Sequence, residues 1–175
     1  MLISILINLA FILNSTRVET QKPLPVVKKQ EIVKQEIPKR IVVKSVNIDL
    51  PVIESPFKDG SWIADEHYAS YAQGTPALNS SNGNTLIFAH ARSKIFKPII
   101  ETKEGDIINI YSQTKIYYYK IVDREIISPY NIEALKSHAK HIVTLLTCIG
   151  ENDENRLMLQ GELIGLSENK LEEVI

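Results

Sequence analysis

Residues 142–148 read Ile-Val-Thr-Leu-Leu-Thr-Cys, and this run decides the fold class that the sequence predicts. Six apolar or β-branched residues in succession are typical of a buried strand. The single cysteine of the chain, Cys148, stands at the end of the run, and a polar loop containing a glycine follows at 149–155. A side chain at a strand end can meet solvent while a rigid sheet holds it. The position is that of a candidate nucleophile, although a lone cysteine is more often a small buried hydrophobe.

Other β-type runs lie on both sides of this one. They occupy residues 41–48, 85–89, 106–111, 116–122 and 156–164, and Ser112–Lys115 is typical of a hairpin turn. Helical signals are short and lie at 63–71, 96–100 and 131–139. Many short strands with few helices predict a mainly β fold, a closed β-barrel of about eight strands with a few short helices.

The N-terminal part differs in composition from the body. Residues 1–14 are hydrophobic and predict an anchor or signal segment, or alternatively a strand or helix of the fold. Residues 15–40 carry seven Lys or Arg against three Glu, with three prolines, and predict a basic extended stalk. A short amphipathic helix at 28–36 is the alternative there. We expect the barrel at 41–168 and a C-terminal tail at 169–175.

Charge and cysteine content exclude several classes of site. The formal net charge is −1, so the whole chain gives no indication of nucleic-acid binding. One cysteine excludes an intrachain disulfide and a thiolate zinc cluster. Basic residues follow the apolar N-terminal segment and none precedes it, which is the pattern of a cytoplasmic body under the positive-inside rule.

Two further residues at predicted strand ends could act with the cysteine. His90 follows the run 85–89, and Arg156 opens the run 156–164. A thiol nucleophile needs a proton-transfer partner, and acyl transfer needs a group that stabilises the oxyanion. His90 suits the first role and Arg156 the second, with Arg92 as a competitor. The alternatives are a partly buried imidazole and a solvated strand-end charge.

The remaining histidines are His67, His138 and His141. All three are predicted at the surface, and the spacing of the last two is a weak metal-site signal. Glu101, Glu104 and Asp106 are read as solvated loop charge. We therefore expect no metal and no cofactor.

Three segments together resemble the sortase family: Thr85–His90, Thr144–Cys148 and Arg156–Gly161. In sortases a strand ends in the catalytic histidine, a Thr-Leu-x-Thr-Cys strand ends in the nucleophile, and an arginine opens the next strand. Shorter matches lie at 46–52, 96–99 and 104–106. The chain departs from the family pattern at Ala89, where many members have glycine, and at Gly150, where many have proline.

The resemblance implies a cysteine transpeptidase with Cys148 as nucleophile, His90 as general acid and base, and Arg156 at the oxyanion. Thr147, Ala89 and Arg92 are expected to contact the substrate. The expected partners are a protein carrying a Leu-Pro-x-Thr-Gly-like sorting motif and an amine acceptor, either a cell-wall precursor or a pilin lysine. The expected location is the cell membrane, with the catalytic domain outside the cytoplasm. A thiol hydrolase and a non-catalytic β-barrel binding module are the alternatives.

Overall fold

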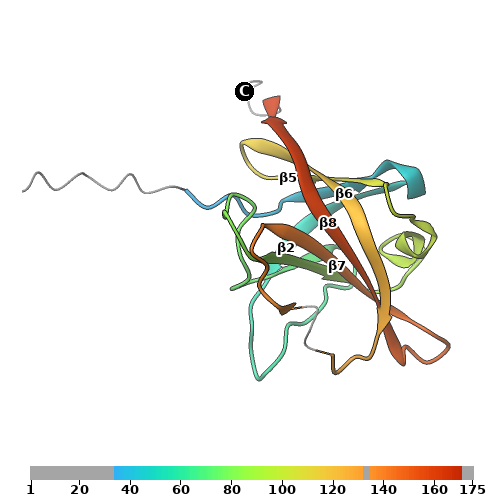
Figure 1. The fold of residues 1–175 in the computed structure, drawn as a ribbon. Coiled ribbons are helices and arrows are strands. Elements are labelled where there is room, and N and C mark those ends of the chain that lie inside the picture. Colours follow the sequence, from blue (N-terminus) through green and yellow to red (C-terminus); the bar gives the residue numbers. More distant parts are fainter. Residues whose placement is uncertain (1–33, 132–134, 171–175) are drawn as a thin grey trace, which may run out of the picture. The chain divides into compact units, whose positions relative to one another are not determined.

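The run ending at Cys148 forms strand β7 (Ile142–Ile149) in the computed structural model, which describes residues 34–131 and 135–170. This strand lies between β4 (Asn84–Ala89), to which it is parallel, and β8 (Asn155–Glu168), to which it is antiparallel. Strands β6 and β8 are paired along most of their length and run side by side in Figure 1. The predicted buried strand is confirmed.

The other strands are β1 (Arg40–Val43), β2 (Ile48–Ser55), β3 (Ala69–Ala72), β5 (Ile107–Tyr111) and β6 (Lys115–Ile127). In the described part of the chain the hydrogen-bonded order is β1-β2-β3-β4-β7-β8-β6-β5, and pairing of β5 with β1 closes the barrel. Closure satisfies strand edges that would otherwise be open to other chains. The predicted closed, mainly β barrel is confirmed.

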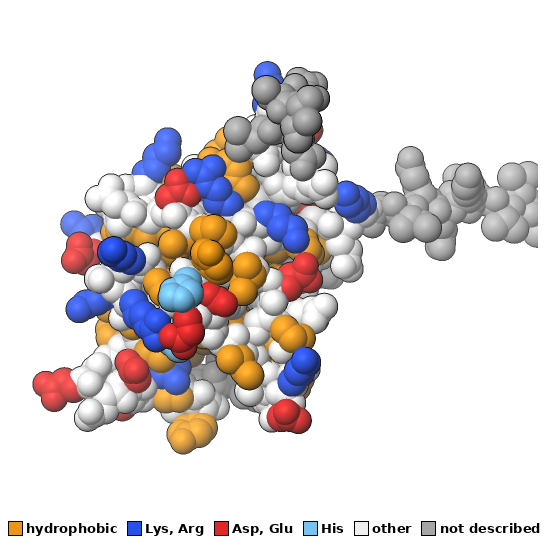
Figure 2. All heavy atoms as spheres, turned by 180° about the vertical axis from the view of Figure 1, so that it is seen from behind, with side chains coloured by type: hydrophobic (Ala, Val, Ile, Leu, Met, Phe, Trp, Pro, Cys, Tyr) orange, Lys and Arg blue, Asp and Glu red, His pale blue; other side chains and the backbone are white. Residues whose placement is uncertain are grey.

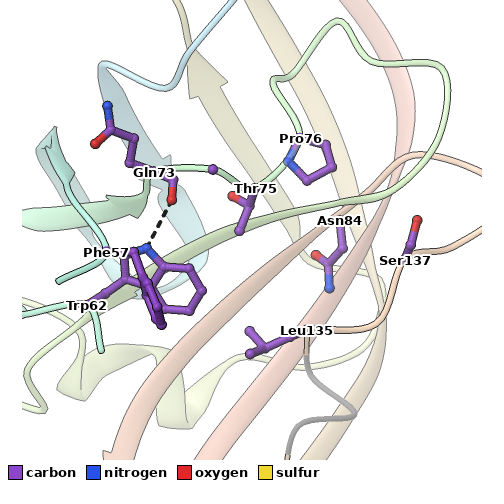
Figure 3. Close-up of a pocket in the computed structure, with 9 residues that line it drawn as sticks. Phe57, Trp62, Gln73, Thr75, Pro76, Asn84, Leu135 and Ser137 are labelled. Atoms are coloured by element: carbon purple, nitrogen blue, oxygen red, sulfur yellow. Dashed lines mark hydrogen bonds between the residues drawn. The ribbon is translucent and has the colours of Figure 1, made fainter. Parts of the chain in front are cut away.

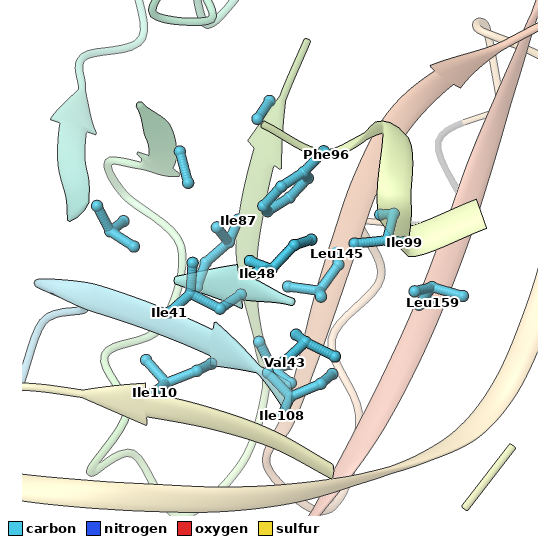
Figure 4. Packing of buried hydrophobic residues seen from close by; sticks show 14 of the residues in the cluster. Ile41, Val43, Ile48, Ile87, Phe96, Ile99, Ile108, Ile110, Leu145 and Leu159 are labelled. Atoms are coloured by element: carbon cyan, nitrogen blue, oxygen red, sulfur yellow. The ribbon is translucent and has the colours of Figure 1, made fainter. Parts of the chain in front are cut away.

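The barrel interior is filled by branched aliphatic and aromatic side chains. Figure 4 shows side chains from several strands and from the 3-10 helix η2 (Lys97–Glu101) packing against one another. The fully buried ones include Ile41, Ile87, Phe96, Ile99, Ile108, Ile110, Tyr117, Tyr119, Leu145 and Leu157. Burying each large apolar side chain contributes roughly 1.5–3 kcal/mol, so the core fixes the strands that carry the site.

Several local predictions need correction. The predicted strand 41–48 is two strands, because the 3-10 helix η1 (Lys44–Val46) interrupts it. Asn47 ends this helix at φ 55° and ψ 36°, a left-handed conformation that asparagine tolerates better than most residues. The predicted helix at 63–71 is wrong, because this stretch contains bends and the start of β3.

Other local predictions are confirmed or narrowed. The Ser112–Lys115 turn is present, with the Ser112 amide donating to the Lys115 carbonyl at 2.8 Å. The helix predicted at 96–100 is the 3-10 helix η2. The helix predicted at 131–139 lies partly outside the described residues, and the part at 135–139 contains no α-helix.

The described end of the predicted stalk lies against the barrel. The Glu36 carbonyl accepts from the Leu78 amide at 2.8 Å, and the Lys39 amide donates to the Tyr111 carbonyl at 2.7 Å. Residues 1–33 and 171–175 lie outside the described residues, so the predicted anchor, most of the stalk and most of the tail stay predictions. Within residues 34–131 and 135–170, no helix has both the length and the apolar character needed to cross a membrane.

Candidate active site

Strand register brings the ends of β4, β7 and β8 together. Cys148 pairs directly with Arg156 across the antiparallel β7–β8 ladder. On the other side of β7, Ala89 is the last residue of β4 and pairs with Thr147. His90 follows Ala89, so it continues the chain beside the cysteine. The three predicted catalytic residues therefore lie at one end of three adjacent strands.

All three residues line one cleft of about 260 Å³. The lining side chains are Trp62, Ala64, Phe88, Ala89, His90, Leu146, Thr147, Cys148 and Arg156. Cys148 is half-buried, and the side chain of His90 is 37% exposed. The thiol and the imidazole can both meet a substrate that enters this cleft. The structure therefore brings His90, Cys148 and Arg156 into one cleft, and their catalytic roles stay a prediction.

Three features around Cys148 shift the pKa of its thiol in different directions. Burial raises its pKa, the positive charge of Arg156 lowers it, and the negative charge of Asp153 raises it again. Because the net direction is upward, most of the free protein carries the protonated thiol at neutral pH. Arg156 is thus the charge in the cleft that favours the reactive thiolate.

The turn between β7 and β8 holds Arg156 in place. Its Nη1 donates to the carbonyls of Asp153 at 2.8 Å and Asn155 at 2.9 Å. Gly150 occupies the turn at φ 105°, where an added Cβ would meet the Glu154 carboxylate at 2.4 Å. Proline, with φ near −65°, could not adopt this conformation. Proline is therefore excluded at position 150 in this conformation of the loop.

Thr147 and Ala89, predicted to contact substrate, line the cleft but are almost completely buried. Thr147 is 2% exposed and Ala89 is 4% exposed. The Thr147 hydroxyl donates to the Ala89 carbonyl at 2.8 Å. This bond joins the residue before the cysteine to the residue before the histidine. The structure thus gives the hydroxyl an internal partner that ties β4 to β7.

Arg92, predicted both as a substrate contact and as a competitor for the oxyanion role, has other partners. Its guanidinium contacts the Glu66 carboxylate and also donates to the Glu66 carbonyl at 2.9 Å. It lines a separate depression, whereas Arg156 lines the cleft with Cys148. The geometry therefore favours Arg156 over Arg92 as the residue next to the thiol.

The family model described as the sortase domain matches residues 41–164. The chain belongs to the sortase family. This match spans the barrel from β1 to β8 and includes Cys148, His90 and Arg156. The suspected family is confirmed.

Known sortases resemble this chain in sequence and in fold. Sortase A from Bacillus anthracis is 28% identical over 143 residues, which cover 78% of this chain and 64% of that protein. Sortase C from Clostridium perfringens SM101 superposes with a TM-score of 0.63 at 26% identity, covering 75% of this chain and 72% of that one. For Listeria monocytogenes sortase A the TM-score is 0.62 at 21% identity, and the match covers 79% of this chain and 94% of that one. Neighbours titled sortase A and sortase C fit about equally, so the fold does not distinguish a subclass.

One histidine of this sortase was placed wrongly from sequence. His141, predicted at the surface, is 7% exposed. Its Nε2 lies 2.8 Å from the hydroxyl of Thr85, which donates its own hydrogen to the Pro76 carbonyl, so Nε2 carries the proton. Its Nδ1 then accepts from the Tyr119 hydroxyl at 3.3 Å. Burial lowers the pKa of His141, which keeps this internal network neutral.

The other histidines and the acidic loop residues do not form a metal site. His67 is exposed and His138 is partly buried. No cluster of three or more His, Cys, Asp or Glu side chains within 34–131 and 135–170 could hold a metal ion. Asp106, one of the three acidic residues considered for calcium, instead accepts from Ser45 at 2.9 Å and from the Lys103 amide at 3.0 Å.

Sequence reasoning missed the segment between β2 and β3, which contributes Trp62 to the cleft. Trp62 also lines a second pocket of about 400 Å³ together with Phe57, Leu135 and Pro76. Figure 3 shows the rings of Phe57 and Trp62 side by side in this pocket, with the indole N–H donating to the Gln73 carbonyl at 3.1 Å. A lone tryptophan in a polar loop was the available signal, because such a large ring is rarely left without a packing partner.

Proposed function

We propose that this sortase is a cysteine transpeptidase that cleaves a Leu-Pro-x-Thr-Gly-like sorting motif and joins it to an amine. The observation that carries the proposal is the single cleft shared by Cys148, His90 and Arg156. A thiol, an imidazole and a guanidinium supply the nucleophile, the proton carrier and the oxyanion partner that acyl transfer needs.

The first half-reaction forms a thioacyl enzyme. The proton of the Cys148 thiol passes to His90, and the sulfur attacks the carbonyl carbon of the Thr–Gly peptide bond. Arg156 stabilises the negative charge on the tetrahedral oxygen. The C–N bond then breaks as His90 gives its proton to the departing glycine amine, which leaves Cys148 in a thioester with the threonine acyl group.

The second half-reaction releases the product. An incoming amine gives a proton to His90 as its nitrogen attacks the thioester carbonyl. The C–S bond breaks, the proton returns to the sulfur, and a new amide joins the two molecules. Water in place of the amine would make the enzyme a thiol hydrolase, so the acceptor decides between the two outcomes.

The pocket beside Trp62 suits the apolar residues that precede the cleaved bond. Because Trp62 lines both this pocket and the cleft, an extended peptide held at Cys148 can continue into it. The rings of Phe57 and Trp62 lie 4.8 Å apart at 63°, an edge-to-face pair open to an apolar side chain. Leucine and proline at the start of a sorting motif fit such a surface.

We further propose that the enzyme acts at the outer face of the cell membrane. The hydrophobic segment 1–14 would anchor the chain, and the proline-containing segment 15–40 would hold the barrel near the membrane. The outer face follows from the cell-surface substrates of the proposed reaction and requires that the charge pattern around the segment be overridden. The expected products are proteins attached to the cell wall or polymerised into pili.

The test is a ligation assay with a labelled Leu-Pro-x-Thr-Gly peptide and a glycine-based amine acceptor. The wild-type protein should join the two, Cys148→Ala should be inactive, and His90→Ala and Arg156→Ala should each lose at least about 100-fold, the low end of the contribution of one such group. The matched control is the exposed Arg124→Ala on β6, which should stay near wild type.

If only hydrolysis occurred with every amine offered, the thiol hydrolase would be the better interpretation and transpeptidation would be refuted. A thiol that fails to react with iodoacetamide in the folded protein would leave the non-catalytic barrel as the better account. Near-normal activity of Arg156→Ala would move the oxyanion role elsewhere.

A further inference from the structure

A contact among three side chains borders the cleft on the side of the histidine. It joins Glu66, from the segment between β2 and β3, to His90 and Arg92, which follow β4. Figure 2 shows one face of the molecule, on which a histidine side chain lies beside acidic and basic side chains. Glu66 takes no part in the reaction proposed for Cys148, His90 and Arg156.

The backbone around Glu66 is fixed by its own neighbours. The Asp65 carboxylate accepts from the amides of His67 at 2.8 Å and Tyr68 at 2.9 Å. The Asp65 amide donates to the Ser70 hydroxyl at 3.1 Å, at the start of β3. Asp65 is therefore committed to the turn, and Glu66 is the carboxylate left to face the histidine.

Arg92 fixes the side chain of Glu66 as well. One nitrogen of the guanidinium contacts Oε2 of the carboxylate, and another donates to the Glu66 carbonyl at 2.9 Å. The second carboxylate oxygen, Oε1, lies 3.6 Å from Nε2 of His90. One arginine thus holds both ends of Glu66 and directs its remaining oxygen at the imidazole.

The carboxylate is charged throughout the neutral range. The hydrogen bond from Arg92 lowers its pKa most, followed by the charge of Arg92 and then the charges of His90 and His67. Its side chain is 63% exposed, and ion pairs at such exposure contribute little to folding stability. The arrangement therefore stabilises little, yet it places a fixed negative charge on the proton carrier of the cleft.

We propose that Glu66, held by Arg92, is a positioning residue for His90 that orients the imidazole for proton transfer in the cleft. This inference rests on the proposed transpeptidase function. The carboxylate acts on the imidazole and not on the substrate, so its loss lowers turnover and leaves peptide binding unchanged. It requires no atom or group beyond those already in the site.

The kinetic test is Glu66→Gln, which keeps the size of the side chain and removes its charge. We expect kcat to fall about tenfold, part of the roughly 10²–10⁴-fold that general acid–base catalysis contributes, with KM within about twofold of wild type. Glu66→Asp should recover part of the loss. The control is Glu162→Gln, the same change at an exposed position on β8, which should leave both parameters unchanged. A rise in KM with kcat unchanged would overturn the proposal.

A double-mutant cycle with Arg92→Ala separates positioning from direct substrate binding. If Arg92 acts only by holding Glu66, Arg92→Ala lowers kcat of the wild type but does not lower it further in a protein that already carries Glu66→Gln. Additive losses would mean that Arg92 contacts the substrate itself, and that result would overturn the proposed role of the arginine.

The NMR signals of the His90 ring give a test that needs no activity, with His90→Gln used for their assignment. In the resting protein, Glu66→Gln and Arg92→Ala should move these signals in the same direction, and Glu162→Gln should not. Unchanged signals in Glu66→Gln would overturn the inference even in an active enzyme. Shifted signals in a protein that joins no peptide would support the contact and refute the transpeptidase function instead.

Discussion

Replacement of Thr147 by valine tests how the ends of β4 and β7 are joined. Valine keeps the shape of threonine but cannot donate to the Ala89 carbonyl, and both residues are at most 4% exposed. A buried acceptor left without its donor costs about 1–3 kcal/mol. The extra buried methyl offsets part of this, up to ~0.8 kcal/mol. We therefore expect Thr147→Val to lower the free energy of unfolding by about 1–2 kcal/mol.

The assay is urea unfolding, with the midpoint and the slope fitted separately. The midpoint should fall while the slope stays unchanged, because the barrel remains intact and only its stability differs. Ligation activity should fall as well, since the lost bond joins the strand ends that carry His90 and Cys148.

Thr144→Val is a matched control for this substitution, because it makes the same change on the same strand. The Thr144 hydroxyl is buried and has no hydrogen-bond partner among the described residues. This substitution should therefore be neutral or stabilising. Equal stability of the two variants would refute the reasoning.

Three further predictions follow from the structure. Asp153→Asn removes a charge that raises the pKa of Cys148, so iodoacetamide should alkylate the thiol faster at neutral pH. Asparagine tolerates the φ of 56° at position 153, so the fold of the loop should be kept. An unchanged alkylation rate would contradict this prediction. Burial lowers the pKa of His141 below its usual 6.5, so the unfolded chain takes up a proton that the folded chain does not. The free energy of unfolding should therefore fall as the pH drops below 6.5, and urea unfolding of His141→Gln should show a weaker dependence on pH. An identical pH dependence in the two proteins would contradict this prediction. Gly161→Ala places a Cβ 3.1 Å from side-chain atoms of Tyr119 on β6 and Val143 on β7. The thermal midpoint should fall, with a loss of about 1–3 kcal/mol in the free energy of unfolding. An unchanged midpoint would contradict this prediction, because it would show that the neighbouring strands can shift to make room.

The strands with strong β patterns were predictable from sequence, and so was the position of three of the residues that line the cleft. The runs at 85–89 and 142–147 are continuous apolar segments, which is the pattern of strands buried on both faces. Their ends carry His90 and Cys148, so the position of both side chains followed from the pattern of each strand. Arg156 followed because a short loop after β7 predicts an antiparallel neighbour.

The sequence did not predict features that depend on contacts between distant segments. β3 spans four residues, Ala-Ser-Tyr-Ala, and is a strand because β2 and β4 pair with it, which no local propensity indicates. His141 is buried because Thr85 and Tyr119 come from other strands to bond its ring. Glu66 reaches the histidine only through the path of a loop without regular structure.

Intact-protein mass spectrometry of the enzyme mixed with a Leu-Pro-x-Thr-Gly peptide, without an amine acceptor, tests the central claim most directly. The account predicts a covalent adduct equal in mass to the acyl part of the peptide, present in the wild type, absent from Cys148→Ala, and lost with formation of the joined product when the amine is added. Joined product from Cys148→Ala, or neither adduct nor product from the wild type with any sorting peptide, would contradict it.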